Sequence, residues 1–182
     1  MIQKAYAPGM TAKKRRKALS EYGKELMEKQ KLKNWYGLRE RQFRKYVDKV
    51  LEKSHMLEDI NPAEILIRFL ESRLDNVVFR LGLAINRKHA RQLVNHGFFL
   101  VNGKTVDIPS IQLKTGDKVS FRDNAKKKVP YTQLEIKLKK YEAPSWLKLD
   151  KKAIQGEIVG LPTLEEVSPP AEISSIFEFY SR

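Results

Sequence analysis

Apolar residues recur at three- and four-residue spacings in two stretches of the chain, a pattern typical of helices with one buried face. The first stretch runs from Leu38 to Leu51 and has Arg and Lys at the intervening positions, so it predicts an amphipathic helix with a basic outer face. The second begins at Asn61, where Asn can cap a helix, the following Pro suits the first turn and Glu64 can complete a capping box. It extends to Gly82, an expected left-handed stop, although a break near Ser72 also fits.

A shorter helix and several strands follow. Asn86 can start a helix that ends at Gly97, and alternating apolar and polar residues predict strands at 98–101, 104–106 and 118–122. The first two strands are separated by Asn-Gly, the commonest two-residue hairpin turn. These elements predict an α+β module over residues 72–122, with a helical pair packed on a short antiparallel sheet.

The remaining segments have weaker patterns. Residues 1–19 predict an extended basic arm, and residues 24–33 suit a short exposed helix. Residues 126–140 fit either a strand or a helix, and glycines and prolines suggest an irregular region before residue 171. The chain ends on apolar residues, which we expect to dock back on a helical core. The predicted organisation is a mostly helical domain that is interrupted by the module. The basic arm covers residues 1–19, the helical domain covers 20–71 together with 171–182, and the module covers 72–122. A basic extension of the module and an irregular acidic tail cover 123–170.

The distribution of charge indicates two kinds of surface. The formal net charge is +14, and residues 1–53 hold 16 basic and 6 acidic side chains, whereas residues 153–182 hold 1 and 5. A strongly basic front predicts a polyanionic partner, either nucleic acid or an acidic membrane surface. An acidic end suggests a separate contact, with another protein.

Several classes of chemistry are excluded or disfavoured. The chain has no cysteine, which rules out disulfides, thiolate zinc sites and cysteine nucleophiles. Its three histidines do not have the spacing of a metal site, and Gly103-Lys104-Thr105 lacks the preceding glycine of a phosphate-binding loop. No apolar run reaches the roughly 20 residues of a membrane-spanning helix. We therefore expect no catalytic residues, no metal, no cofactor and no membrane partner.

Cationic side chains on a folded frame are the chemistry that remains. Arg can grip two phosphate oxygens or stack on a base, and phosphate contacts supply much of the affinity for nucleic acids. Arg87 and Arg91 lie one turn apart on a predicted helix face that can follow a phosphate backbone. The alternative is that such cations pair locally with acidic neighbours, such as Asp75 beside Arg73.

Aromatic residues divide into two groups. Those at apolar-face spacings are predicted to be core, namely Phe43, Tyr46, Phe69, Phe79, Phe98 and Phe99. Those in the basic front are candidates for stacking on bases, namely Tyr6, Tyr22, Trp35 and Tyr36. Because side chains cannot read the narrow major groove of duplex RNA, we expect recognition of a folded RNA by the shape of its backbone.

Several motifs resemble one known family. They are Arg73-Leu74-Asp75-Asn76-Val77-Val78-Phe79-Arg80-Leu81-Gly82, Ala90-Arg91-Gln92-Leu93-Val94-Asn95-His96-Gly97 and Val101-Asn102-Gly103, with further matches from Ser20 to Arg182. Together they resemble the family of bacterial small-subunit ribosomal protein four and its RNA-binding module. Family members usually begin with some forty more residues, often with a cysteine cluster, so a naturally short start or a trimmed chain is expected here.

The resemblance implies a structural role in the small ribosomal subunit. It implies binding of the five-prime domain of 16S ribosomal RNA, an early step of subunit assembly, and a contact with small-subunit protein five that influences decoding accuracy. It also implies a place near the path of messenger RNA and a cytoplasmic ribosome, with an organellar ribosome left open. We expect no isolated homo-oligomer.

These arguments lead to one set of candidate site residues. The candidate RNA-binding residues are Lys13, Lys14, Arg15, Arg16, Lys17, Tyr22, Lys31, Arg39, Arg41, Arg44, Arg73, Arg80, Arg87, Lys88, Arg91 and Lys104. The candidate protein-contact residues are Glu172, Glu178 and Tyr180. The competing hypotheses are an RNA-modifying enzyme or synthetase fragment that carries the same module, a heat-shock-type ribosome-binding factor, and a membrane protein with a basic helix.

Overall fold

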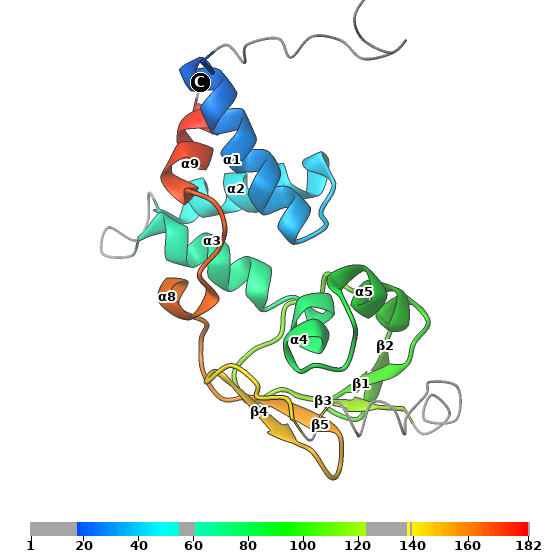
Figure 1. Ribbon diagram of the computed structural model, residues 1–182. Helices are drawn as coiled ribbons and strands as arrows, with labels where there is room; N and C mark the ends of the chain where they lie inside the picture. The colour runs from blue at the N-terminus through cyan, green and yellow to red at the C-terminus, as the bar shows by residue number, and fades with distance from the viewer. Residues whose placement is uncertain (1–17, 55–60, 123–137, 139, 182) are drawn as a thin grey trace, which may run out of the picture.

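The computed structural model describes residues 18–54, 61–122, 138 and 140–181. Figure 1 shows helices gathered at one end and an α+β module at the other, with α3 leading from the first to the second. The helical end contains α1 (Glu21–Trp35), α2 (Glu40–Ser54), α3 (Pro62–Glu71), α8 (Leu164–Val167) and α9 (Ile173–Ser181). The module contains α4 (Leu74–Arg80), α5 (Arg87–Asn95), β1 (Phe99–Val101), β2 (Lys104–Val106), β3 (Lys118–Phe121), β4 (Leu147–Asp150) and β5 (Gln155–Ile158). The predicted α+β class is confirmed.

The helical end has its own apolar core. Phe43, Val47 and Val50 form the buried stripe of α2 and pack with residues of α3, while Ile173 and Ile176 of α9 join the same cluster. The last helix lies beside the first, so the two ends of the described chain meet (Figure 1). Because α2 buries a single stripe, its charged side chains remain on the opposite face.

The first helix is fixed largely by polar contacts. Ser20 caps it by accepting from the amide of Gly23, and Leu32 is the one apolar side chain that it buries among the described residues. Lys29 donates to Glu40 at 2.7 Å, and Lys33 donates to the same carboxylate at 3.1 Å. Burial raises the pKa of Glu40, but hydrogen bonds from Lys29, Tyr180 and Lys33 outweigh this effect and lower the pKa to about 2.

The long apolar pattern after Asn61 is divided between two helices. The side chain of Asn61 caps α3 by accepting from the Ala63 amide, as expected. Glu64 does not complete a capping box but pairs with Arg68 at 3.1 Å, so that expectation is wrong. The helix ends at Ser72, which confirms the alternative of a break, and α4 then runs to a stop at Gly82 with a φ of 74°.

The module is built on one antiparallel sheet with the strand order β2-β1-β3-β5-β4. Asn102 and Gly103 have φ of 50° and 79°, as the predicted hairpin turn requires, and Leu100 lies opposite Thr105. The region 123–170, which is expected from the sequence to be a basic extension and an irregular tail, is not irregular throughout, because Leu147–Asp150 and Gln155–Ile158 form β4 and β5 and extend the sheet. The apolar core of the module consequently includes Ile158 as well as Leu74.

The described residues contain neither a membrane-spanning helix nor a metal-binding cluster. Within those ranges, no helix is long and apolar enough to cross a bilayer. In the same part of the chain, no group of His, Asp and Glu residues is arranged to hold a metal ion. The segment 126–140, which fits a strand or a helix, lies almost wholly outside the described residues.

Candidate nucleic-acid interface

The outer face of α2 carries exposed cations. Arg39 precedes the helix, and Arg41, Lys45 and Lys49 follow at four-residue spacing, so these last three line one side of it. Arg44 is also exposed, and its Nε lies 3.9 Å from the carboxylate of Asp48. An exposed pair at that distance contributes little, so the guanidinium of Arg44 remains available to a phosphate.

A groove of about 370 Å³ lies beside these cations. Lys45 and Lys49 of α2 form one wall, and Ser110 and Gln112 from the connection between β2 and β3 form part of the other. Arg73 lies between the two walls. The groove therefore spans both parts of the molecule and has cations on the helical side.

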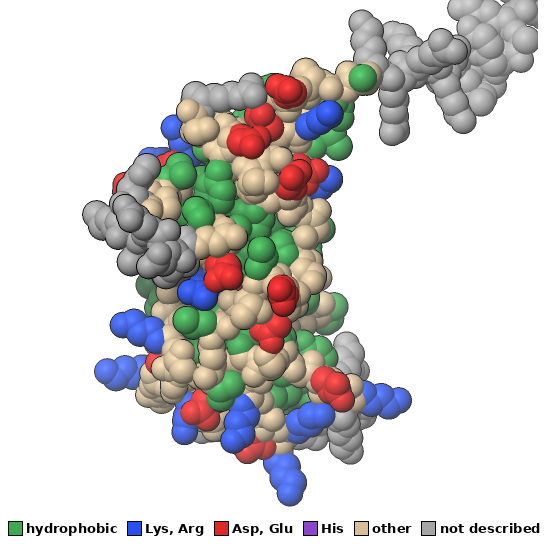
Figure 2. Space-filling view, turned by 90° about the vertical axis from the view of Figure 1, so that its left-hand side faces the viewer, with side chains coloured by type: hydrophobic (Ala, Val, Ile, Leu, Met, Phe, Trp, Pro, Cys, Tyr) green, Lys and Arg blue, Asp and Glu red, His purple; other side chains and the backbone are tan. Residues whose placement is uncertain are grey.

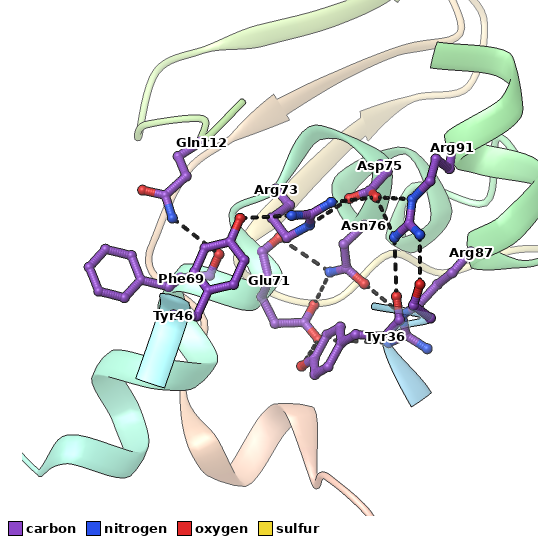
Figure 3. Close-up of polar contacts among 11 residues, drawn as sticks. Tyr36, Tyr46, Phe69, Glu71, Arg73, Asp75, Asn76, Arg87, Arg91 and Gln112 are labelled. Carbon is purple, nitrogen blue, oxygen red and sulfur yellow. Dashed lines mark hydrogen bonds and ion pairs between the residues drawn. The ribbon is translucent and has the colours of Figure 1, made fainter. Parts of the chain in front are cut away.

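Behind the groove, a buried polar seam joins the helical end to the module; we use this name for the contacts of Asp75 and Glu71 with their arginine partners. Arg73 is only 3% exposed and donates to both oxygens of Asp75, at 3.0 and 2.8 Å, and to the hydroxyl of Tyr46 at 2.7 Å (Figure 3). Burial lowers the pKa of Arg73, but the hydrogen bonds to Asp75 outweigh this effect and raise it above its usual range.

Arg91 of α5 completes the environment of Asp75. Its Nε donates to Asp75 at 2.9 Å, and its two terminal nitrogens donate to the backbone carbonyls of Gly37 and Tyr36, at 2.6 and 3.3 Å. Figure 3 shows this fork facing the turn between α1 and α2. One guanidinium of the module thus binds the backbone of the helical end.

Glu71 is the second carboxylate of the seam and is fully buried. Arg80 donates to both of its oxygens, at 2.9 and 2.8 Å, and Tyr36 donates its hydroxyl at 2.8 Å. Asn76 donates to the same carboxylate and accepts from Arg87 at 2.7 Å. Burial first, and then the charge of Glu71, raise the pKa of Tyr36 well above its usual range.

Arg87 lies among aromatic rings. Its guanidinium carbon is 4.2 Å from the ring centre of Trp35, 4.9 Å from that of Tyr36 and 4.7 Å from that of Phe79. Burial lowers the pKa of Arg87, although Glu71 opposes this effect. Stacking of this kind stabilises a planar cation through the faces of the rings.

The seam changes the interpretation of the sequence. Arg73, Arg80, Arg87 and Arg91 are candidate RNA-binding residues in the sequence, whereas in the structure each guanidinium contacts protein groups and each side chain is at least half-buried. Tyr36 was a stacking candidate, yet it is 2% exposed and bonded to Glu71, so it is not available to a base. The alternative of local pairing holds for Arg73 with Asp75, and Arg80 and Arg91 likewise pair with the buried carboxylates Glu71 and Asp75.

The other candidate residues lie in several places. Lys88 and Lys104 are exposed on the module, Lys31 is exposed and pairs with Glu28, and the exposed ring of Tyr22 lies 5.4 Å from that of Phe179. The basic run Lys13 to Lys17 lies outside the described residues. Lys45 and Lys49 were missed as candidates, although their four-residue spacing after Arg41 is visible in the sequence.

A different surface lies on the side of α8 and α9. Figure 2 shows apolar and acidic side chains along the helical end of this face, and Lys and Arg projecting at the sheet end. A groove of about 660 Å³ is lined there by residues from the start of α3 and from α8 and α9, among them Ala63, Leu164, Ser174 and Phe177. Its chemistry suits a protein segment better than a phosphate backbone.

The three candidate protein-contact residues all lie in or next to α9. Glu172 and Glu178 are exposed, whereas Tyr180 is half-buried. The hydroxyl of Tyr180 donates to Glu40 at 2.7 Å, and burial together with this bond raises its pKa. Tyr180 therefore also helps to hold α9 against the helices beneath it.

Comparison with known proteins identifies relatives of the whole chain. Residues 72–119 match the family described as S4 domain, and residues 1–71 match the ribosomal protein S4/S9 N-terminal domain. The chain is 43% identical to small ribosomal subunit protein uS4 of Acetivibrio thermocellus over all of this chain and 85% of that protein. It is 44% identical to the protein of the same name from Thermotoga petrophila, over 99% of this chain and 84% of that protein, and 44% identical to that from Aquifex aeolicus, over 100% and 86%.

Proposed function

Because the chain belongs to the family of small ribosomal subunit protein uS4, we propose that it binds the five-prime domain of 16S ribosomal RNA and nucleates subunit assembly. It is a ribosomal protein with an S4 RNA-binding domain, and the family is structural and not enzymatic. The enzyme hypothesis is thereby wrong. The chain works on a cytoplasmic ribosome, where it associates with ribosomal RNA.

The observation that carries the RNA proposal is the exposed cation row of α2 beside the groove. Arg39, Arg41 and Arg44 point their charge away from the buried stripe of the helix, and Lys45 and Lys49 continue the row into the groove. Cations at fixed positions on a rigid frame can follow one contour of a folded RNA without reading bases. Lys88 and Lys104 supply further charge on the module.

A second surface serves a protein neighbour, for which we propose small-subunit protein five. The apolar groove of α3, α8 and α9 supports this proposal, as does the acidic character of residues 153–182, with 5 acidic side chains and 1 basic. Glu172 and Glu178 lie exposed in or next to the helix that carries the groove residues Ser174 and Phe177. Through this contact the protein contributes to decoding accuracy, near the path of messenger RNA.

The RNA proposal is tested by removing cations from α2. Arg41→Ala with Arg44→Ala should weaken binding to a five-prime-domain fragment, and the slope of log affinity against log salt should become shallower by about 0.9 for each phosphate that the variant no longer neutralises. The unfolding midpoint should change little because both side chains are exposed. Filter binding over a series of KCl concentrations measures affinity and slope, and urea unfolding measures the midpoint.

Lys24→Ala provides the matched control for charge. Lys24 is exposed in a groove that also contains Glu21, Glu25 and Glu178, where an RNA backbone would be repelled. Its removal should leave the salt slope unchanged. Equal affinity and slope in the double variant and the wild type would contradict a role of α2 in RNA binding.

The protein-contact proposal is tested by filling the groove. Ser174 is exposed and lines it, so Ser174→Trp should obstruct an inserted segment while leaving the core intact. We expect reconstituted particles with normal RNA affinity and a reduced content of small-subunit protein five. Thr115→Trp, at an exposed position of the module, is the control. Normal uptake of protein five by the Ser174 variant would place its contact elsewhere.

A further inference from the structure

We propose that Asp75 and Glu71, with their arginine partners, are positioning residues that fix the angle between the helical end and the module, so that their separate cations form one RNA-binding surface. This inference rests on the proposed RNA function. In this proposal Arg73, Arg80, Arg87 and Arg91 affect RNA binding indirectly, because they orient the side chains that contact the RNA.

The first observation is that the two apolar cores are separate. The cluster of the helical end includes Phe43 and Leu70, the cluster of the module includes Leu74 and Phe99, and these clusters share no buried member among the described residues. The two apolar cores therefore do not merge across the junction. The angle between them depends on the groups that lie at the junction.

The second observation is that arginines of the module make several polar ties across this junction. Arg91 of α5 donates to the carbonyls of Gly37 and Tyr36, which follow α1. Arg73, at the start of α4, donates to Tyr46 of α2. Arg80 at the end of α4 donates to both oxygens of Glu71 at the end of α3.

The third observation is that these ties are directional and shielded. A guanidinium that donates through two nitrogens fits its acceptors in one orientation, whereas apolar surfaces can slide over one another. Asp75 holds the forks of Arg73 and Arg91 at the same time, and Asn76 links Glu71 to Arg87. Rotation of the module would break several of these bonds together and leave buried charges without partners.

The consequence concerns the RNA-binding surface. Lys45 and Lys49 belong to the helical end, whereas the exposed cations Lys88 and Lys104 belong to the module, as do Ser110 and Gln112 across the groove. Two binding surfaces that are held at a fixed angle bind one extended ligand more tightly than two that move independently, because the second contact forms at a high effective concentration. The seam therefore acts on affinity without contributing a phosphate contact.

Binding measurements separate positioning from direct contact. Asp75→Asn keeps the shape of the side chain but removes the charge that holds Arg73 and Arg91. If the seam positions the surface, this variant should bind the RNA fragment about tenfold more weakly, with the wild-type salt slope. If the arginines grip phosphates instead, their release should leave affinity unchanged or higher, and Arg91→Ala should make the slope shallower by about one.

Asp48→Asn is the matched control. It removes the same charge from an exposed position of α2, near Arg44, and should not weaken binding. Should Asp75→Asn unfold the protein, Tyr46→Phe removes only the hydrogen bond to Arg73, and Arg91→Lys retains the charge but not the fork. Both should show the same effect to a smaller extent.

The angle itself can be measured without RNA. Because the chain has no native cysteine, spin labels can be placed specifically with Glu52→Cys and Thr115→Cys, which are exposed on α2 and on the module. The distance distribution should be narrow in the otherwise native chain and broader after Asp75→Asn. An unchanged distance distribution would overturn the positioning role. If the distribution broadens but the native protein does not bind ribosomal RNA, the proposed function is overturned while the role of the seam in fixing the angle remains supported.

Discussion

Glu71→Ala is expected to lower the free energy of unfolding by about 3–5 kcal/mol, the cost of leaving buried charges without a partner. Glu71 is fully buried and accepts from Arg80, Tyr36 and Asn76. Alanine would remove these acceptors while the donors remain in place, and the guanidinium of Arg80 would lose both oxygens of its fork. Urea unfolding followed by circular dichroism measures this decrease.

Glu64→Ala is the comparison for this variant. Glu64 also pairs with an arginine, Arg68, but both side chains are about one-third exposed, and such pairs contribute about 0–1 kcal/mol. A large difference between the two variants would show that burial decides the effect. A decrease of less than about 1 kcal/mol for Glu71→Ala would mean that water replaces the carboxylate and that the seam is weaker than its geometry indicates.

Local chemistry made much of the fold predictable. The caps at Asn61 and Asn86, the stop at Gly82 and the Asn102 turn each depend on neighbouring residues, and all four are present in the structure. The amphipathic period of α2 likewise requires only its own sequence. Signals that act within a few residues can be recognised before any tertiary contact is known.

The hairpin of β4 and β5 could not be recognised in the same way. Its strands are four residues long, and Gly156 in the middle of β5 gave the appearance of a loop. The structure explains this glycine, because a Cβ there would overlap with the side chain of Leu81, which is fully buried. Its conformational freedom is therefore less important than the space that it leaves for another element.

The seam was unpredictable for a related reason. A sequence does not show whether a cation on a helix face is exposed to solvent or donates to a carbonyl that is distant in the chain. Arg91, for example, donates to the carbonyl of Gly37, at a sequence separation of 54 residues. Asp75 is visible in the sequence as a possible partner of Arg73, but the choice between an exposed cation and a buried one depends on how two domains pack. The exposed candidates of α2 were predictable because their own apolar stripe determines which face is buried.

Leu74→Ala is expected to cost about 2–5 kcal/mol of stability, the range for removing a large aliphatic side chain from a core. Leu74 is fully buried in the module cluster, and its backbone amide is held by the carbonyl of Ile111 at 2.9 Å. This bond restrains collapse of the surrounding structure into the space, so the value should lie in the upper part of the range. Leu161→Ala deletes the same atoms at a position that is 56% exposed and should change stability by less than about 0.5 kcal/mol. Equal effects of the two variants, measured by urea unfolding, would show that Leu74 does not lie in the core that supports α4 and, through it, the Arg73–Asp75 contact.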